Sequence, residues 1–169
     1  TGGGGVIITN DEALAMHAKH LTTTAKVSHG WDYTHDQIGY NYRLPNINAA
    51  LGCAQLEQLG GFLKSKRQLF ECYKSAFANV PELNVVAEPA GCKSNYWLQT
   101  LMLDNSAADQ KNAILAATND AGLMTRPVWT LMHRLEPYRE CPKMELPVAE
   151  SLEKRLINLP SSAQLRMGG

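Results

Sequence analysis

A long series of mostly apolar residues with helical spacing constrains the fold of this chain most. One face repeats every 3.6 residues, first at Ala49, Ala50, Cys53, Leu56 and Leu59 and then at Leu63, Arg67, Phe70, Tyr73 and Phe77. Gly60-Gly61 interrupts the series. The pattern predicts two consecutive helices, or one long kinked helix, from a cap at Asn46 to near Pro81. Such a helix is a natural bridge between two domains.

Different patterns flank this helix. Before it, residues 6–9 resemble a strand and residues 10–21 a short helix capped by Asn10. After it come short strands at 85–87, 96–103 and 124–129, helices at 106–121 and 148–156, and a turn or short helix at 130–136. We expect an α/β chain of three parts. Residues 1–45 form the end of a large domain and include a functional loop. Residues 46–79 form the connecting helix or helices, and residues 80–169 form a small α+β domain.

Composition excludes several classes of function. The 169 residues carry 16 basic and 16 acidic side chains, so the neutral chain offers no electrostatic argument for nucleic acid. No apolar run approaches the roughly 20 residues that span a bilayer. The four cysteines form no C-x-x-C pair, which favours reduced thiols and a cytoplasmic protein. His17 and His20 lie three residues apart, but no cysteine or carboxylate completes a metal site, so we expect none.

The segment from Thr22 to Leu44 lacks periodicity and is rich in aromatic and polar residues, which is typical of a functional loop. Within it, Asn41 can donate its amide N–H to a phosphate oxygen, and Arg43 can bind an anion with two N–H groups. The residues alone leave an anion-binding loop and a structural arginine tied to backbone carbonyls as alternatives. The glycines at 2–5 precede a strand instead of a helix, which favours a simple turn over a phosphate loop.

The residues Gly39-Tyr-Asn-Tyr-Arg-Leu44, followed by Ala49-Ala50 and Gln55-Leu56, resemble the G-x-N-x-R-[ML] … A-A … Q-L signature of the DegT/DnrJ/EryC1/StrS nucleotide-sugar aminotransferases. Residues 1–11 resemble the glycine strand that follows the family's Schiff-base lysine. Residues 126–133 resemble its substrate-side turn, and with Asn158-Leu-Pro-Ser the similarity covers nearly the whole chain. Residues 42–48, 95–98 and 129–133 most resemble the branch that acts on UDP-linked 4-keto sugars in legionaminic-acid synthesis.

The resemblance implies the C-terminal part of a fold type I transferase that uses pyridoxal 5'-phosphate (PLP). Family members are homodimers with active sites shared between subunits, and the residue matching Asn41 reaches the cofactor phosphate of the neighbour. Arg43 would contact substrate or brace the loop, and Tyr40 would wall the pocket or pack for stability. His133 would bind a sugar hydroxyl or a nucleotide phosphate, or simply be packed.

The resemblance also implies that the Schiff-base lysine lies upstream of Thr1, so no catalytic residue is assigned here and this chain is expected to be inactive alone. The complete enzyme would move an amino group from L-glutamate to the 4-keto group of a UDP-linked deoxyhexose for cell-surface sugar biosynthesis. Two alternatives stay open. One is a PLP-dependent sugar dehydratase of the same family, with histidine in place of the lysine; the other is a non-catalytic dimerisation or binding fragment.

Overall fold

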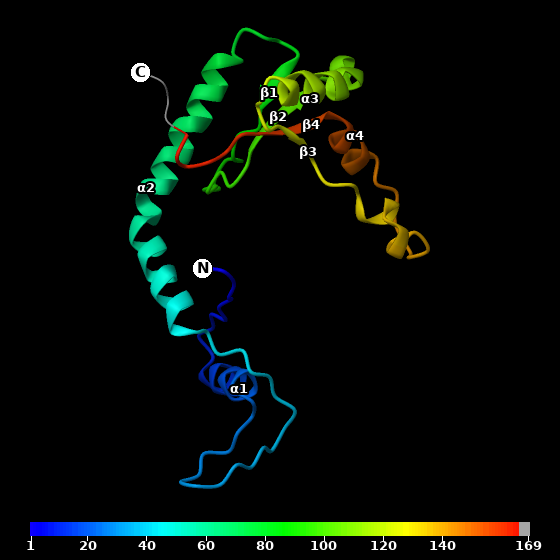
Figure 1. Cartoon of the computed structure of the whole chain (residues 1–169). Helices are drawn as coiled ribbons and strands as arrows, with labels where there is room; N and C mark the ends of the chain where they lie inside the picture. The colour runs from blue at the N-terminus through cyan, green and yellow to red at the C-terminus, as the bar shows by residue number, and fades with distance from the viewer. Residues whose placement is uncertain (166–169) are drawn as a thin grey trace. The chain divides into compact units, whose positions relative to one another are not determined.

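The computed structural model describes residues 1–165 and divides the chain into two compact units, Thr1–Leu59 and a second that begins at Gly60. Figure 1 shows the elements of both. The helix α2 (Asn46–Ala76) contributes to each unit and runs without interruption through Gly60-Gly61. Of the two arrangements that the sequence allowed, the structure therefore has one helix.

The first unit begins with an extended segment that leads into α1 (Glu12–Thr22). The side chain of Asp11 accepts a hydrogen bond of 3.0 Å from the Leu14 backbone N–H, so the helix cap lies one residue later than the expected Asn10. The strand expected at residues 6–9 is wrong, because no described segment pairs with it. A backbone with strand-like residues becomes a β-strand only when a neighbour accepts and donates its hydrogen bonds.

The second unit contains a four-stranded antiparallel sheet in the order β1 (Leu83–Val85), β2 (Gln99–Leu103), β4 (Leu156–Leu159), β3 (Arg126–Pro127). In the β2–β4 register, Leu101 lies opposite Ile157. Between the strands lie η1 (Asn105–Gln110), α3 (Lys111–Asp120), η2 (Met132–Arg134), η3 (Glu136–Tyr138) and α4 (Pro147–Arg155).

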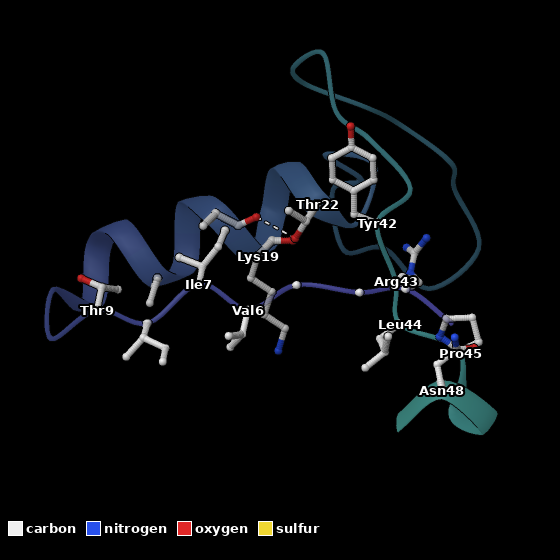
Figure 2. Close-up of a pocket in the computed structure, with 16 residues that line it drawn as sticks. Val6, Ile7, Thr9, Lys19, Thr22, Tyr42, Arg43, Leu44, Pro45 and Asn48 are labelled. Atoms are coloured by element: carbon white, nitrogen blue, oxygen red, sulfur yellow. Dashed lines mark hydrogen bonds between the residues drawn. The ribbon is translucent and has the colours of Figure 1, made fainter. Parts of the chain in front are cut away.

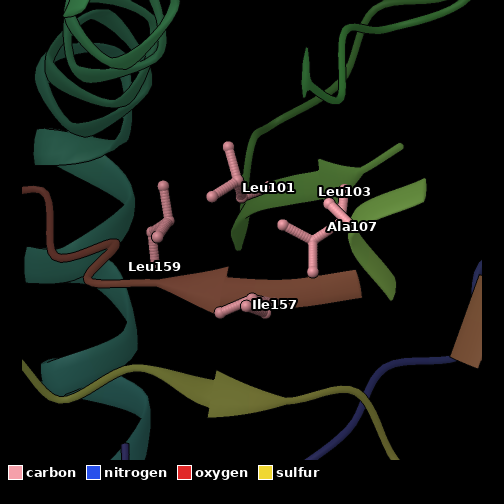
Figure 3. Close-up of a cluster of buried hydrophobic side chains, with 5 residues drawn as sticks. All are labelled: Leu101, Leu103, Ala107, Ile157 and Leu159. Carbon is pink, nitrogen blue, oxygen red and sulfur yellow. The ribbon is translucent and has the colours of Figure 1, made fainter. Parts of the chain in front are cut away.

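The core of the second unit lies on one face of this sheet (Figure 3). Alternate residues of β2 are buried, as expected for a strand with one face in a core. The buried cluster comprises Leu101, Leu103, Ala107, Ile157 and Leu159. Tyr73, near the end of α2, and Phe77, just after it, pack against this cluster. Ile114 and Leu115 of α3 also pack against it. These contacts fix the loops that leave the sheet.

Several predicted boundaries change in the structure. The helix expected at 106–121 starts as a 3-10 turn, and only Lys111–Asp120 is α-helical. The last helix ends at Arg155, and the chain continues directly into β4, which the sequence analysis did not foresee. No helix within residues 1–165 has both the length and the apolar character needed to cross a membrane.

Candidate functional site

The most distinctive site of the first unit is the turn at residues 39–43. It pairs with residues 21–24, at the end of α1 and just beyond it. The Tyr40 N–H donates to the Leu21 carbonyl at 2.7 Å, and the Tyr42 N–H donates to the Thr22 carbonyl at 2.9 Å. In return the Thr24 N–H donates to the Tyr40 carbonyl at 3.0 Å. Asn41 therefore lies opposite Thr23 in a short antiparallel bridge, and its position is set by backbone hydrogen bonds on both sides.

Gly39 is required by close packing against the backbone. A Cβ atom at this position would lie 2.5 Å from both the Ala25 nitrogen and the Thr24 carbonyl carbon, closer than side chains approach backbone. Thr24 and Ala25 both have positive φ, at 75° and 49°, and Ala25 is fully buried. The glycine of the G-x-N-x-R pattern thus lets the turn approach a tight, strained stretch of chain.

Arg43 fixes the side chain of Asn41. Its Nη1 donates to the Asn41 Oδ1 at 3.2 Å, and its Nη2 donates to the Thr23 carbonyl at 3.0 Å. Because a guanidinium can only donate, the amide oxygen of Asn41 must face Arg43, and the amide NH₂ faces away. Within residues 1–165 no acceptor is bonded to that NH₂, and Asn41 is exposed. The turn therefore presents one oriented amide donor to a ligand.

Arg43 makes the contacts of a brace, to the Asn41 amide oxygen and to a backbone carbonyl, while its role toward substrate stays a prediction. Tyr40 and Tyr42 stack, with ring centroids 5.4 Å apart, and both rings are exposed. The partner segment at Thr22–Ala25 was missed in the sequence analysis. Its only signal there is three consecutive threonines directly after a predicted helix, which favour extended backbone.

A groove of about 970 Å³ lies beside this turn in the first unit (Figure 2). The extended residues 3–9 run along α1 and form one wall, and residues 42–45 with Asn48 close one end. Val6, Ile7 and Ile8 stay exposed. A wide trough lined mainly by glycines and aliphatic side chains is suited to packing against polypeptide, and Asn41 is not among its lining residues. We therefore distinguish this groove from the exposed Asn41 amide of the turn.

Comparison with known proteins shows which family the chain belongs to. The DegT/DnrJ/EryC1/StrS aminotransferase family matches residues 1–168. The chain belongs to this family. GDP-perosamine synthase of Vibrio cholerae is a relative at 32% identity over 162 residues, which covers 95% of this chain and 44% of the relative. The chain thus spans less than half the length of that family member.

Solved structures agree on the fold. Helicobacter pylori PseC, an aminotransferase involved in the biosynthesis of pseudoaminic acid, superposes with a TM-score of 0.86 at 22% identity, over 94% of this chain and 43% of PseC. The PLP form of Spr1654 from Streptococcus pneumoniae superposes with a TM-score of 0.82 at 19% identity, over 96% and 42% of the two chains. The α/β fold class expected from the sequence, with a small α+β domain at its end, is confirmed.

The remaining residue that the family resemblance singled out, His133, lies in the second unit on η2. Its side chain is 10% exposed, and its Nε2 lies 3.1 Å from the Glu150 Oε1 on α4. Arg134 binds Glu153 on the same helix at 3.2 Å. The contact with Glu150 occupies Nε2, and Nδ1 is the other ring nitrogen.

Lys66 is a partly buried lysine whose contacts are structural. Burial lowers the pKa of its ammonium. Its Nζ donates to the carbonyls of Tyr96, Trp97 and Ser161 at 3.1, 2.9 and 2.5 Å. An ammonium with its three donors satisfied by fixed carbonyls holds the chain together and has no lone pair to attack with. Within residues 1–165, no group of three His, Cys, Asp or Glu side chains is placed to hold a metal ion.

Proposed function

We propose that the protein containing this chain is a PLP-dependent aminotransferase that moves the amino group of L-glutamate to the 4-keto group of a UDP-linked deoxyhexose. The observation that carries the proposal is the Asn41 amide, oriented by Arg43 on an exposed turn of a DegT/DnrJ/EryC1/StrS family chain. Because the chain covers 44% of its relative's length, the proposed activity belongs to the whole protein.

The donor set at the turn fits a phosphate monoester. Asn41 offers an N–H with its direction fixed by the brace, and no carboxylate takes part in the brace to repel an anion. We propose that this amide binds the cofactor phosphate of the second subunit in a homodimer, which explains why an ordered donor stays exposed. When bound, PLP supplies the electron sink for transamination, and the protein supplies binding and orientation.

The other residues take supporting roles in this proposal. Arg43 is a positioning residue, because its guanidinium donates to the Asn41 amide oxygen and to the Thr23 carbonyl. Tyr40 lines the ligand side of the turn, where its stacking with Tyr42 limits its rotamers. His133 binds the sugar or nucleotide through Nδ1, with the ring held by Glu150.

Proton transfer at the reacting carbon requires an amine that alternates between covalent attachment and free base. We propose that a lysine in the sequence upstream of Thr1 supplies this amine, so the 169-residue chain would not turn over alone.

The motif that resembles the legionaminic-acid branch supports UDP as the nucleotide of the substrate. The Vibrio cholerae relative is named for a GDP-linked product, so the two nucleotides must be compared directly.

The test uses the chain extended upstream to the length of its relatives and loaded with PLP. Its absorbance spectrum is recorded before and after L-glutamate, and then after a UDP-linked or a GDP-linked 4-keto deoxyhexose. Loss of the bound pyridoxal band with glutamate, and its return with the UDP sugar, is the expected result. Bound cofactor that glutamate leaves unchanged would reject the aminotransferase and favour the dehydratase. Failure to bind PLP would favour a binding fragment, and return of the band with the GDP sugar alone would correct the nucleotide.

A further inference from the structure

Two tryptophans of the second unit form an exposed stacked pair that the proposed function has not used. Trp97 lies in the β1–β2 connection, two residues before β2, and Trp129 lies between β3 and η2. Their ring centroids lie 6.3 Å apart with 20° between the planes, yet the two residues are 65% and 67% exposed. Exposing two adjacent indoles to water is unfavourable, so such a pair usually marks a binding surface.

The position of Trp97 is fixed by the residue before it. Tyr96 has φ +47°, a conformation that non-glycine residues rarely adopt, and it is 6% exposed and stacks on Phe70 at 4.5 Å. Strained backbone persists where the surroundings determine it, and it concentrates at ligand sites. With Tyr96 pointing into the core, the strained backbone directs the next side chain, Trp97, outward.

Charged groups on α2 hold this connection in place. Lys66 donates to the carbonyls of both Tyr96 and Trp97. Arg67 binds Glu88 through two hydrogen bonds of 2.8 and 3.0 Å, and Glu88 also accepts from the Ser94 N–H at 2.5 Å. Trp97 is therefore presented by a rigid segment, which lowers the entropy lost when a ligand binds.

Trp129 is fixed from the other side by β3. Arg126 pairs with Asn158 of β4 in the sheet register, and its Nη1 donates to the Asn119 Oδ1 at 2.7 Å. Asn119 in turn donates to the Thr125 carbonyl at 3.1 Å. Trp129 follows this anchored strand by two residues and precedes the His133 turn by four. The pair thus combines two elements that only the fold brings together.

We propose that Trp97 and Trp129 form the stacking platform for the nucleobase of the nucleotide-linked sugar. The inference rests on the proposed function for its ligand. A centroid separation of 6.3 Å already lies in the range of direct ring stacking, about 4.5–7 Å, so no third ring fits between the indoles. The base extends the stack on an outer face. Stacking on tryptophan is available to every base, so the platform supplies affinity, and other contacts choose the nucleotide.

The experiment measures nucleotide binding to the upstream-extended, PLP-loaded protein by isothermal titration calorimetry, which needs no optical reporter. UDP and GDP are titrated separately, with ribose 5-phosphate as the probe that lacks a base. We expect saturable binding of UDP, and a dissociation constant raised about tenfold or more in Trp97→Ala and in Trp129→Ala. Trp97→Phe and Trp129→Phe should restore most of the affinity. Circular dichroism checks that each variant is folded.

Unchanged UDP affinity in both alanine variants would overturn the platform, as would equal binding of ribose 5-phosphate. A concentration-dependent dimer that either alanine variant dissociates in the absence of nucleotide would assign the pair to a subunit interface instead. The glutamate half-reaction of the wild type is measured in parallel. If it fails while UDP binds through the tryptophans, the proposed function is wrong and the platform stands. If it succeeds while the variants bind UDP normally, the platform alone is wrong.

Discussion

At the scale of single residues, Gly39 tests whether the turn is built as described. Gly39→Ala places a methyl group against the backbone of Thr24 and Ala25, where no side chain can move aside. We expect a loss of stability of about 1–3 kcal/mol, measured by urea unfolding of the upstream-extended protein. Gly30→Ala is the matched control, because its Cβ meets nothing within 4 Å in the same loop. Equal effects of the two substitutions would contradict the close approach.

Asn41→Asp separates the hydrogen bond from Arg43 to the Asn41 oxygen from the proposed bond of the Asn41 NH₂ to the cofactor phosphate. The aspartate keeps an oxygen for Arg43, so the turn should hold, but it replaces the outward NH₂ by a negative oxygen. Loss of a hydrogen bond to a charged group costs about 1.5–3 kcal/mol, so PLP affinity should fall by at least tenfold. Equilibrium binding of PLP to the extended protein measures this. Asn84→Asp, which adds the same charge on β1, should leave the affinity unchanged.

The sequence was sufficient to select the residues of the turn and insufficient to assign what each of them does. Gly39, Asn41 and Arg43 stand out by type and spacing, but the acceptor for Arg43 is a backbone carbonyl twenty residues earlier, which no side-chain pattern encodes. The same limit applies to Trp97 and Trp129. They are thirty-two positions apart in the sequence and meet only because β3 and β2 join the same sheet through β4.

At the scale of elements, the connection between β1 and β2 depends on an ionised Glu88. Hydrogen bonds from Arg67, then from the Ser94 N–H, lower the pKa of Glu88 from 4.5 to about 2. A group with a depressed pKa in the folded state stabilises above its unfolded pKa and loses that contribution as the pH falls toward the folded value. Stability should therefore drop between about pH 4.5 and pH 2.

Glu88→Gln keeps the shape of the side chain and removes the charge. We expect lower stability at pH 7 and a shallower loss of stability below pH 4.5, measured by urea unfolding over a pH series. Glu140→Gln, at an exposed position, is the control and should follow the wild type. A variant that retains the full acid dependence would show that other carboxylates control it.

Alanine substitution of Gly60, in the interior of α2, and of Gly122, just past the end of α3, should change stability in opposite directions. A Cβ at Gly60 meets nothing within 4 Å, so Gly60→Ala should stabilise the helix by about 0.5–1 kcal/mol. Gly122 has φ +79° just past the end of α3, so Gly122→Ala should destabilise by about 1–2 kcal/mol. Thermal unfolding followed by circular dichroism compares the two. A loss of stability in Gly60→Ala would point to a close partner over this face.

Periodicity predicted the helices well because their hydrogen bonds are local. The sequence predicted a helical region from Asn46 to near Pro81, as two helices or one kinked helix, and the glycine just after α3. Strands were less predictable, because each needs a partner from elsewhere in the chain. Residues 6–9 have strand composition but no pairing segment among the described residues. Leu156–Leu159 pairs on both sides, although Pro160, a residue typical of turns, follows it directly.

At the scale of the whole molecule, the two units differ in how much core they possess. Only Ala25 is buried among the residues before Gly60, while the second unit has a continuous cluster under its sheet. Large apolar side chains of the first unit face solvent, including Val6, Ile7, Ile8, Ile38 and Ile47. Burial of apolar area is the main stabilising term in folding, at about 25 cal/mol per Å². The first unit therefore needs further polypeptide over its groove to reach the stability of the second.

This difference predicts the order of proteolysis. In the 169-residue chain, thermolysin should first cut within residues 1–59, and the segment from the second half of α2 through β4 should survive as the resistant product, identified by mass spectrometry. Cleavage follows the population of opened states, and a unit without a core opens at little cost. Extending the chain upstream should protect the first unit by covering Val6–Ile8 and the groove beside α1. Equal resistance of the two units in the short chain would mean that this apolar surface is already covered, and self-association measured by sedimentation would then identify a second copy as the cover.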